Sequence, residues 1–378
     1  MLWALAAGNF VIGTGIMMPA GMMNVLGDAF GLPVPRIAML VWLGAIVMGV
    51  GAPAMAQIAS RLDRRMLLVG ALALYVVGHL ASAVAPGFGT LLAARVVTVV
   101  GAAVFTPQAA AALGVLLPPH RRAAGVTFAF LGWSVAATLG MPLGSWLGAT
   151  LGWRSAYLLE AAMALAAAVA VARTLPPRVF SPGVSFTVWR QVGGSAALRL
   201  ALAVTVVQTA GQFTLSSFLA PEYRRLLDAG PGLIAALFTL FGAFGFVGNV
   251  AASRLVGRLG TPRTVALTLG AMLLGLSTWS IGVWTGTVAL IVLALVPWGL
   301  GCFSSNSLQQ ARLIGLAPAL APATVALNSS GLYLGQAIGA LAGSAMLAAG
   351  QPGGLAPFGV ALMAMALVLS SRVERVRG

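Results

Sequence analysis

The feature that most constrains this chain is a succession of long apolar runs separated by turns of only a few residues. About 20 apolar residues are needed for an α-helix to cross the hydrocarbon core of a bilayer. We distinguish twelve such runs, at about residues 2–25, 37–60, 66–85, 91–117, 125–150, 156–175, 198–220, 233–257, 264–284, 286–311, 323–349 and 355–371. The sequence therefore predicts an all-α polytopic membrane protein with twelve transmembrane helices.

Composition supports this interpretation and excludes several other classes. Of the 378 residues, 60% are hydrophobic and 7% are charged, whereas about 25% are charged in soluble domains. All 21 basic residues are arginine, so a Walker-type phosphate loop and a Schiff-base lysine are both excluded. The single cysteine, Cys302, excludes an intrachain disulfide and a cysteine metal cage. We expect no cofactor and no metal.

The chain divides into two halves that repeat each other. Residues 176–197 are rich in proline and glycine and are predicted to form a cytoplasmic linker between residues 1–175 and 198–378. Three patterns recur at offsets of 195 to 198 residues: Arg61-Leu62-Asp63 as Arg258-Leu259-Gly260, Gly140, Gly144 and Gly148 as Gly335, Gly339 and Gly343, and Gly101 with Phe105 as Gly299 with Phe303. The repeat predicts two pseudo-symmetric six-helix bundles.

The distribution of arginine predicts the orientation. With both termini in the cytoplasm, sixteen arginines fall in cytoplasmic segments and four fall outside, while Arg95 lies within a predicted helix. Cytoplasmic loops carry the excess of basic residues in membrane proteins. The net charge of +15 is therefore attributed to topology, and we expect no nucleic-acid partner.

The densest charge cluster in the first half is the short turn 59–66 between the second and third apolar runs. It resembles the loop between helices 2 and 3 of the major facilitator superfamily, with Ser60 and Asp63 at positions where that family usually has Asp and Gly. The resemblance implies a gating loop, which we expect to act as a cytoplasmic latch. Its predicted residues are Ser60, Arg61, Asp63, Arg64, Arg65 and, from the second half, Arg258.

Other stretches resemble the drug and sugar efflux branch of the same superfamily. They are Phe10–Gly15, Gly152-Trp153-Arg154, Gly211-Gln212-Phe213, Leu327–Ser330 and Tyr333-Leu334-Gly335. The segment with Gly140, Pro142 and Gly144 resembles the antiporter motif of its fifth helix, with Met141 inserted. This chain departs from many relatives at Ile16, where they carry a glutamate, so that carboxylate is not available for proton coupling.

Polar and aromatic residues are placed by this resemblance on helices that line a central cavity. Gln208, Gln212 and Ser216 are spaced four apart and share one helix face. Gln309 lies three residues after Asn306 in the tenth run. The candidate substrate residues are Arg95, Phe105, Trp133, Gln208, Gln212, Ser216, Phe303, Asn306, Asn328, Tyr333 and Gln336. Interhelical hydrogen bonding and core packing are the alternative roles for these residues.

Energy coupling requires a titratable group inside the membrane. The only carboxylate predicted within a helix span is Glu160, at a depth close to that of Arg95. The two could form a buried ion pair that is structural, or Glu160 could exchange its proton while Arg95 alternates between Glu160 and substrate.

These observations favour a secondary transporter that exports a small organic compound by alternating access, coupled to protons, as a monomer in the bacterial inner membrane. An importer or an uncoupled facilitator on the same fold is the alternative. A membrane-embedded enzyme is not expected, because the six acidic residues, two histidines and one cysteine form no convergent set. A sensor would need a signalling domain, for which no stretch of sequence remains.

The orientation can be tested by labelling single cysteines from outside intact cells in a Cys302→Ser background. A cysteine at Gly87 should react and one at Ser60 should not, because the arginine asymmetry places these positions on opposite sides. The reverse pattern would overturn the orientation.

Overall fold

The structure is a computed structural model that describes residues 1–58, 62–180 and 186–377. Within these ranges the chain is helical and has no strands, and twelve helices are long and apolar enough to cross a membrane. These are α1 (Leu2–Gly21), α4 (Met39–Ile58), α5 (Arg64–Ala83), α6 (Phe88–Leu116), α7 (Pro119–Thr150), α8 (Trp153–Thr174), α10 (Ala196–Ser216), α12 (Pro231–Leu259), α13 (Thr261–Thr285), α14 (Val288–Leu316), α15 (Ala321–Ala348) and α16 (Leu355–Arg377). The predicted fold class is confirmed.

Shorter helices occupy the connections. They are α2 (Met23–Phe30), α3 (Val34–Ile37), α9 (Phe186–Gly194), α11 (Leu219–Leu227) and the 3₁₀ turns η2 (Pro318–Leu320) and η3 (Pro352–Gly354). Helix α9 lies inside the predicted linker, which is therefore not irregular throughout. The first predicted span, 2–25, ends earlier than expected, because the backbone leaves helical geometry at Met22.

The chain forms two compact units. One comprises Met1–Leu32 and Met39–Val184, and the other comprises Pro33–Ala38 and Ser185–Gly378. The boundary at Val184 falls within the predicted linker. Segment Pro33–Ala38 belongs to the second unit although it precedes α4, and Ser344 of α15 donates a hydrogen bond to the carbonyl oxygen of Pro35 (2.9 Å).

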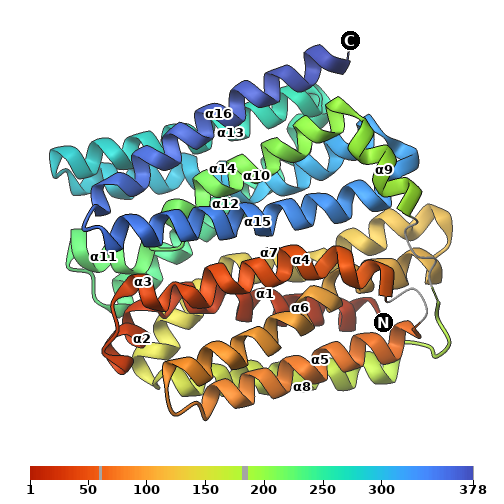
Figure 1. Cartoon of the computed structure of the whole chain (residues 1–378), viewed down its shortest axis with the longest axis horizontal. Coiled ribbons are helices and arrows are strands. Elements are labelled where there is room, and N and C mark those ends of the chain that lie inside the picture. The colour runs from red at the N-terminus through yellow and green to blue at the C-terminus, as the bar shows by residue number, and fades with distance from the viewer. Residues whose placement is uncertain (59–61, 181–185, 378) are drawn as a thin grey trace. The chain divides into compact units, whose positions relative to one another are not determined.

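The two units use the same packing scheme. In the first, α1 packs against α7 and α8, α5 against α6 and α8, and α4 against α6. In the second, α10 packs against α15 and α16, α13 against α14 and α16, and α12 against α14 (Figure 1). Each contact in one unit thus has its counterpart in the other. This correspondence is the internal repeat that the sequence offsets predict.

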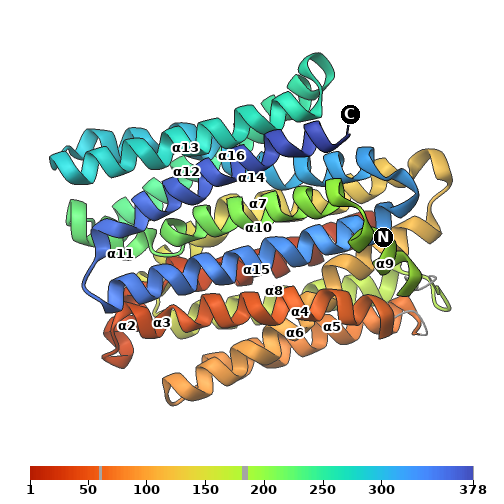
Figure 2. The ribbon, with the colours of Figure 1, turned by 45° about the horizontal axis from the view of Figure 1, so that its top comes forward.

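The repeated glycines lie at close helix crossings. A Cβ atom added to Gly144 of α7 would lie 2.7 Å from the carbonyl oxygen of Met18 in α1. At the equivalent Gly339 of α15, a Cβ atom would overlap the carbonyl oxygen of Ala210 in α10. Figure 2 shows α10 and α15 running side by side. Because lipid supplies no hydrophobic drive for helices to associate, close backbone approach is a main source of their packing energy.

Arg312, predicted to lie in the cytoplasmic segment just after the tenth span, lies within a helix instead of a loop. It is buried in α14, where its guanidinium donates to the Oγ atom (2.9 Å) and carbonyl oxygen (2.8 Å) of Ser370 and pairs with Glu374 (2.6 Å). Both partners lie on α16. The reason for the difference is that α14 continues to Leu316, beyond the span predicted from apolarity. The side chain ties the last helix of the second unit to α14.

The glycine crossing yields a direct stability test. Gly339→Ala should lower the thermal unfolding midpoint of the purified protein, because overpacking against backbone costs about 1–3 kcal/mol. Gly270→Ala is the matched control, since a Cβ atom there meets no other atom within 4 Å and alanine favours the helix. Equal midpoints for the two variants would contradict the packing argument.

Candidate functional site

The predicted site residues divide between the two units. Arg95, Phe105, Trp133 and Glu160 lie in the first unit, and the remaining cavity candidates lie in the second.

Arg95 of α6 is buried and is held by backbone carbonyl groups. Its Nη1 donates to Gly15 (2.8 Å), its Nη2 to Ile16 (3.1 Å) and its Nε to Leu40 (3.1 Å). Pro19 lies inside α1 and has no N–H, so the carbonyl four residues earlier, that of Gly15, lacks its helical donor. Arg95 supplies that donor. The side chain therefore joins α6 to α1 and α4.

Glu160 of α8 is 1% exposed, and its Oε2 atom has no hydrogen-bond partner. Arg95 is close enough to interact electrostatically with it, but among the residues that the structure describes no ion pair joins the two. The reason is that α5 packs against both α6 and α8 and places Tyr75 and His79 in this region. The direct ion pair between Arg95 and Glu160, one of the two predicted arrangements, is therefore not formed.

The aromatic candidates of the two units pack into helix contacts. Phe105 is fully buried against Gly8 of α1, and Phe303 lies against Gly245 of α12. Trp133 donates from Nε1 to the hydroxyl oxygen of Thr106 (3.2 Å). Core packing, the alternative role predicted for these aromatic residues, accounts for the contacts.

The second unit contains a polar ladder across three helices. Thr205 of α10 donates to the side-chain oxygen of Asn328 in α15 (2.7 Å), and the Asn328 amide donates to Asn306 in α14 (2.9 Å). Thr205 and Asn328 are fully buried. The ladder brings the predicted residues Asn306 and Asn328 together.

Further amides lie next to this ladder with unused hydrogen-bonding capacity. Gln208 is three residues from Thr205 and Gln309 is three from Asn306, so each shares a helix face with a ladder residue. The carbonyl oxygen of Gln208 and both polar atoms of Gln309 have no partner, although both side chains are buried. Gln336 and Ser216 are also buried with an unpartnered oxygen, while Gln212 is 8% and Tyr333 9% exposed.

Thr205 and the pair His79 and Tyr157 were not among the predicted site residues. Thr205 precedes Gln208, Gln212 and Ser216 by helical spacing, so the same periodicity could have identified it. The pairing of His79 with Tyr157 gives no such signal, because the two residues come from different helices.

Of the predicted gating loop, Ser60 and Arg61 lie outside the described residues. Asp63 caps α5 by accepting from the N–H of Arg65 (2.8 Å), and its other oxygen accepts from the N–H of Arg178 (2.6 Å). The N–H of Arg64 donates to the carbonyl oxygen of Val179 (2.8 Å). These bonds, which we call the linker clasp, hold the start of the linker against α5.

The linker clasp sets the protonation of Asp63. Partial burial acts to raise the pKa of this carboxyl group, but backbone N–H groups, chiefly those of Arg178 and Arg65 with smaller contributions from Val179 and Met66, lower the pKa below its usual 3.8. A depressed pKa in the folded state means that the stabilisation is complete above the unfolded value and is lost as the pH falls through the folded value. The clasp should therefore be intact at neutral pH.

The other arginines of this predicted set have different surroundings. The buried Arg64 donates from Nη1 to the side-chain oxygen of Gln108 in α6. Arg258 is exposed in the last turn of α12, where a cation is favoured by the helix dipole. In the predicted antiporter motif, Gly140 and Gly144 face α1, and Pro142 is buried within α7.

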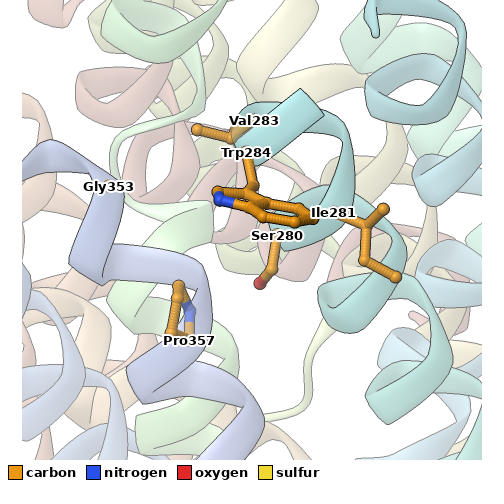
Figure 3. Close-up of a pocket in the computed structure, with 6 residues that line it drawn as sticks. All are labelled: Ser280, Ile281, Val283, Trp284, Gly353 and Pro357. Carbon is orange, nitrogen blue, oxygen red and sulfur yellow. The ribbon is translucent and has the colours of Figure 1, made fainter. Parts of the chain in front are cut away.

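A shallow apolar groove of about 440 Å³ lies in the second unit, lined by Ser280, Ile281, Val283, Trp284, Gly353 and Pro357. Figure 3 shows Trp284 of α13 and Pro357 of α16 on its two sides. Trp284 is 87% exposed at the end of a spanning helix, where tryptophan commonly anchors the membrane interface. None of the predicted cavity residues lines this groove.

The linker clasp predicts a proteolysis result. Asp63→Ala should accelerate tryptic cleavage after Arg178, because the substitution removes both the helix cap, worth about 0.5–2 kcal/mol, and the bond to the linker. Cleavage after Arg190, also exposed, is the internal control and should keep its rate. Unchanged cleavage after Arg178 would show that Asp63 does not hold the linker.

The chain is similar to known membrane transporters. The family model described as Major Facilitator Superfamily matches residues 5–340. The chain is 28% identical to the inner membrane transport protein YdhP of Escherichia coli (strain K12), over 97% of this chain and 94% of that protein. It is 26% identical to a probable sugar efflux transporter of Helicobacter pylori (strain G27), over 89% and 86% of the two chains.

Among solved structures, the crystal structure of a D-xylose–proton symporter superposes with a TM-score of 0.79 at 16% identity, covering 98% of this chain and 96% of that one. At this identity the likeness concerns the fold alone. Twelve spanning helices, two units with one packing scheme and a family match over most of the sequence lead to one conclusion: this chain is a multi-pass membrane transporter, not an enzyme, and it belongs to the major facilitator superfamily.

Proposed function

We propose that this protein exports small, uncharged polar organic compounds in exchange for protons, as a monomer in the bacterial inner membrane with both termini in the cytoplasm. The observation that carries the proposal is the amide set of the second unit, in which buried Gln208, Gln309 and Gln336 have polar atoms without partners.

Unpartnered buried polar atoms cost about 1–3 kcal/mol each. A site that binds a polar ligand is a place where this cost is recovered, because the ligand supplies the missing partners. Amide side chains both donate and accept hydrogen bonds, which suits hydroxyl-bearing compounds. The buried Arg312 is already paired with Glu374 on α16, so an uncharged compound fits this amide set better than a charged one.

Export rather than uptake is supported by the name of the Helicobacter relative and by the motif with Gly140, Pro142 and Gly144. The inner-membrane placement is supported by the name of the Escherichia coli relative. Proton exchange is supported by Glu160, a carboxyl group buried at membrane depth without a cation in contact.

Transport should be measured in inside-out membrane vesicles with an acidified interior, in which export appears as accumulation. A panel of radiolabelled mono- and disaccharides is the probe, with glucuronate as the charged counterpart of glucose. We expect accumulation of at least one neutral sugar, its loss when a protonophore is added, and no accumulation of glucuronate.

The amide set is tested in the same assay by Gln208→Met. This substitution keeps the side-chain length, and the carbonyl oxygen that it removes has no hydrogen-bond partner within the protein. Initial transport should fall about tenfold, equivalent to about 1.4 kcal/mol. Ser280→Ala, in the groove away from the amides, is the control and should transport normally. Accumulation driven only by an alkaline interior would instead identify an importer, and uptake that stops at equal concentrations whatever the gradient would identify a facilitator.

A further inference from the structure

The first unit contains a second group of buried polar atoms without partners, separate from the amide set. Both ring nitrogens of His79, the hydroxyl group of Tyr157 and the Oε2 atom of Glu160 have no hydrogen-bond partner, and the three side chains are at most 1% exposed. Four unpartnered polar atoms in one buried region are unusual, since such groups are normally paired. They indicate that this region binds something not accounted for by the protein's own bonds.

These three side chains lie on two helices that pack against each other, α5 and α8. Tyr157 and Glu160 are three residues apart on α8 and share a helix face. The His79 ring on α5 lies 5.8 Å from the Tyr157 ring, between centroids, and 4.5 Å from that of Tyr75. We call His79, Tyr157 and Glu160 the acid cluster.

The acid cluster is bounded by groups that are already bonded. Tyr75 donates its hydroxyl to the carbonyl oxygen of Ile12 (3.0 Å). Arg95 is bound to carbonyl oxygens, including that of Gly15. A Cβ atom at Gly15 would lie 2.9 Å from His79 Nε2, so this nitrogen lies against α1 at the residue that Arg95 holds.

The charged and titratable groups around Glu160 come from three of the packed elements. They are Tyr157 on α8, Tyr75 and His79 on α5, and Arg95 on α6; α1 has no titratable side chain, and those of α7 are in its first turn. No cation contacts the Glu160 carboxyl group among the described residues. A buried carboxylate without a cation in contact is costly, which favours the protonated, neutral form in this conformation.

We propose that the acid cluster is the site of the exchanged proton, with Glu160 as the acid and with His79 and Tyr157 as positioning residues that hold the carboxylate after the proton leaves. On release, the O–H bond of the Glu160 carboxyl group breaks and the proton passes to a water molecule. The carboxylate then accepts hydrogen bonds from the Tyr157 hydroxyl and a His79 ring N–H, which are unused donors in the protonated form. Arg95 stays on its carbonyl groups and stabilises the anion by its field.

This inference rests on proton-coupled export, yet it can be tested without any substrate. Infrared spectroscopy of the purified protein in lipid should show a carboxylic acid C=O band at about pH 7, where exposed carboxyl groups are ionised. The band should be absent in Glu160→Gln and should disappear from the parent protein on raising the pH. Glu222→Gln is the matched control, because Glu222 is buried in an ion pair with Arg225 (2.6 Å), and its spectrum should keep the band.

The positioning residues are tested by a second measurement. The chain has two histidines, so ¹⁵N labelling of histidine gives NMR signals from His79 and His120 only. The His120→Gln variant shows which of these signals belongs to His79. The His79 signal should shift when the carboxyl band disappears, and this shift should be lost in Glu160→Gln. In Tyr157→Phe the band should persist to higher pH than in the parent protein, because the carboxylate has lost a donor.

Absence of the band from the parent protein, or its persistence in Glu160→Gln, would overturn the acid cluster as a proton site. A His79 signal that is insensitive to Glu160 would overturn its positioning role. If the band behaves as expected but Glu160→Gln vesicles still accumulate sugar against the gradient, the site is not the coupling site, and proton-driven export stands. If the band behaves as expected and no vesicle transports any probe, the proposed function fails while the proton site stands.

Discussion

The bond between Arg95 and the carbonyl oxygen of Gly15 is the interaction on which the first unit depends. Lipid offers no hydrogen bonds, so a polar group inside the membrane must find its partner within the protein. Pro19 leaves one carbonyl of α1 without a donor, and a guanidinium group at the same depth needs acceptors. Each of these two costly features satisfies the other, and the result fixes α1, α4 and α6 together.

Because polar groups inside the membrane need partners within the protein, buried polar atoms that have none are informative. Arg95 and Arg312 are buried cations whose guanidinium groups bond to neighbouring helices. In contrast, Gln309 and His79 are buried with both of their polar side-chain atoms unpartnered. The two arginines therefore hold helices together, whereas Gln309 and His79 are among the residues to which we assign the solute and the proton in our proposals.

A contact could be predicted from the sequence only where the residue types of both partners follow a recognisable pattern. The small-residue faces with Gly144 and Gly339 could be recognised because packing repeats with the helical period and recurs in both halves. The hydrogen bonds of Arg95 could not be predicted, because its acceptors are backbone carbonyl groups and every residue type has one. Asp63 is similar, since it binds the N–H of Arg178, 115 residues away. A latch of side-chain charges was expected there because only side chains are visible in a sequence.

The two buried arginines differ in the order in which the ribosome makes their partners. The acceptors of Arg95 precede it by 55 to 80 residues, so they are already in the membrane when α6 arrives. The partners of Arg312 follow it by 58 and 62 residues, near the end of the chain. During synthesis the partners of Arg312 are therefore made only with α16. A chain cut short before Ser370 would lack every α16 group that bonds this buried guanidinium.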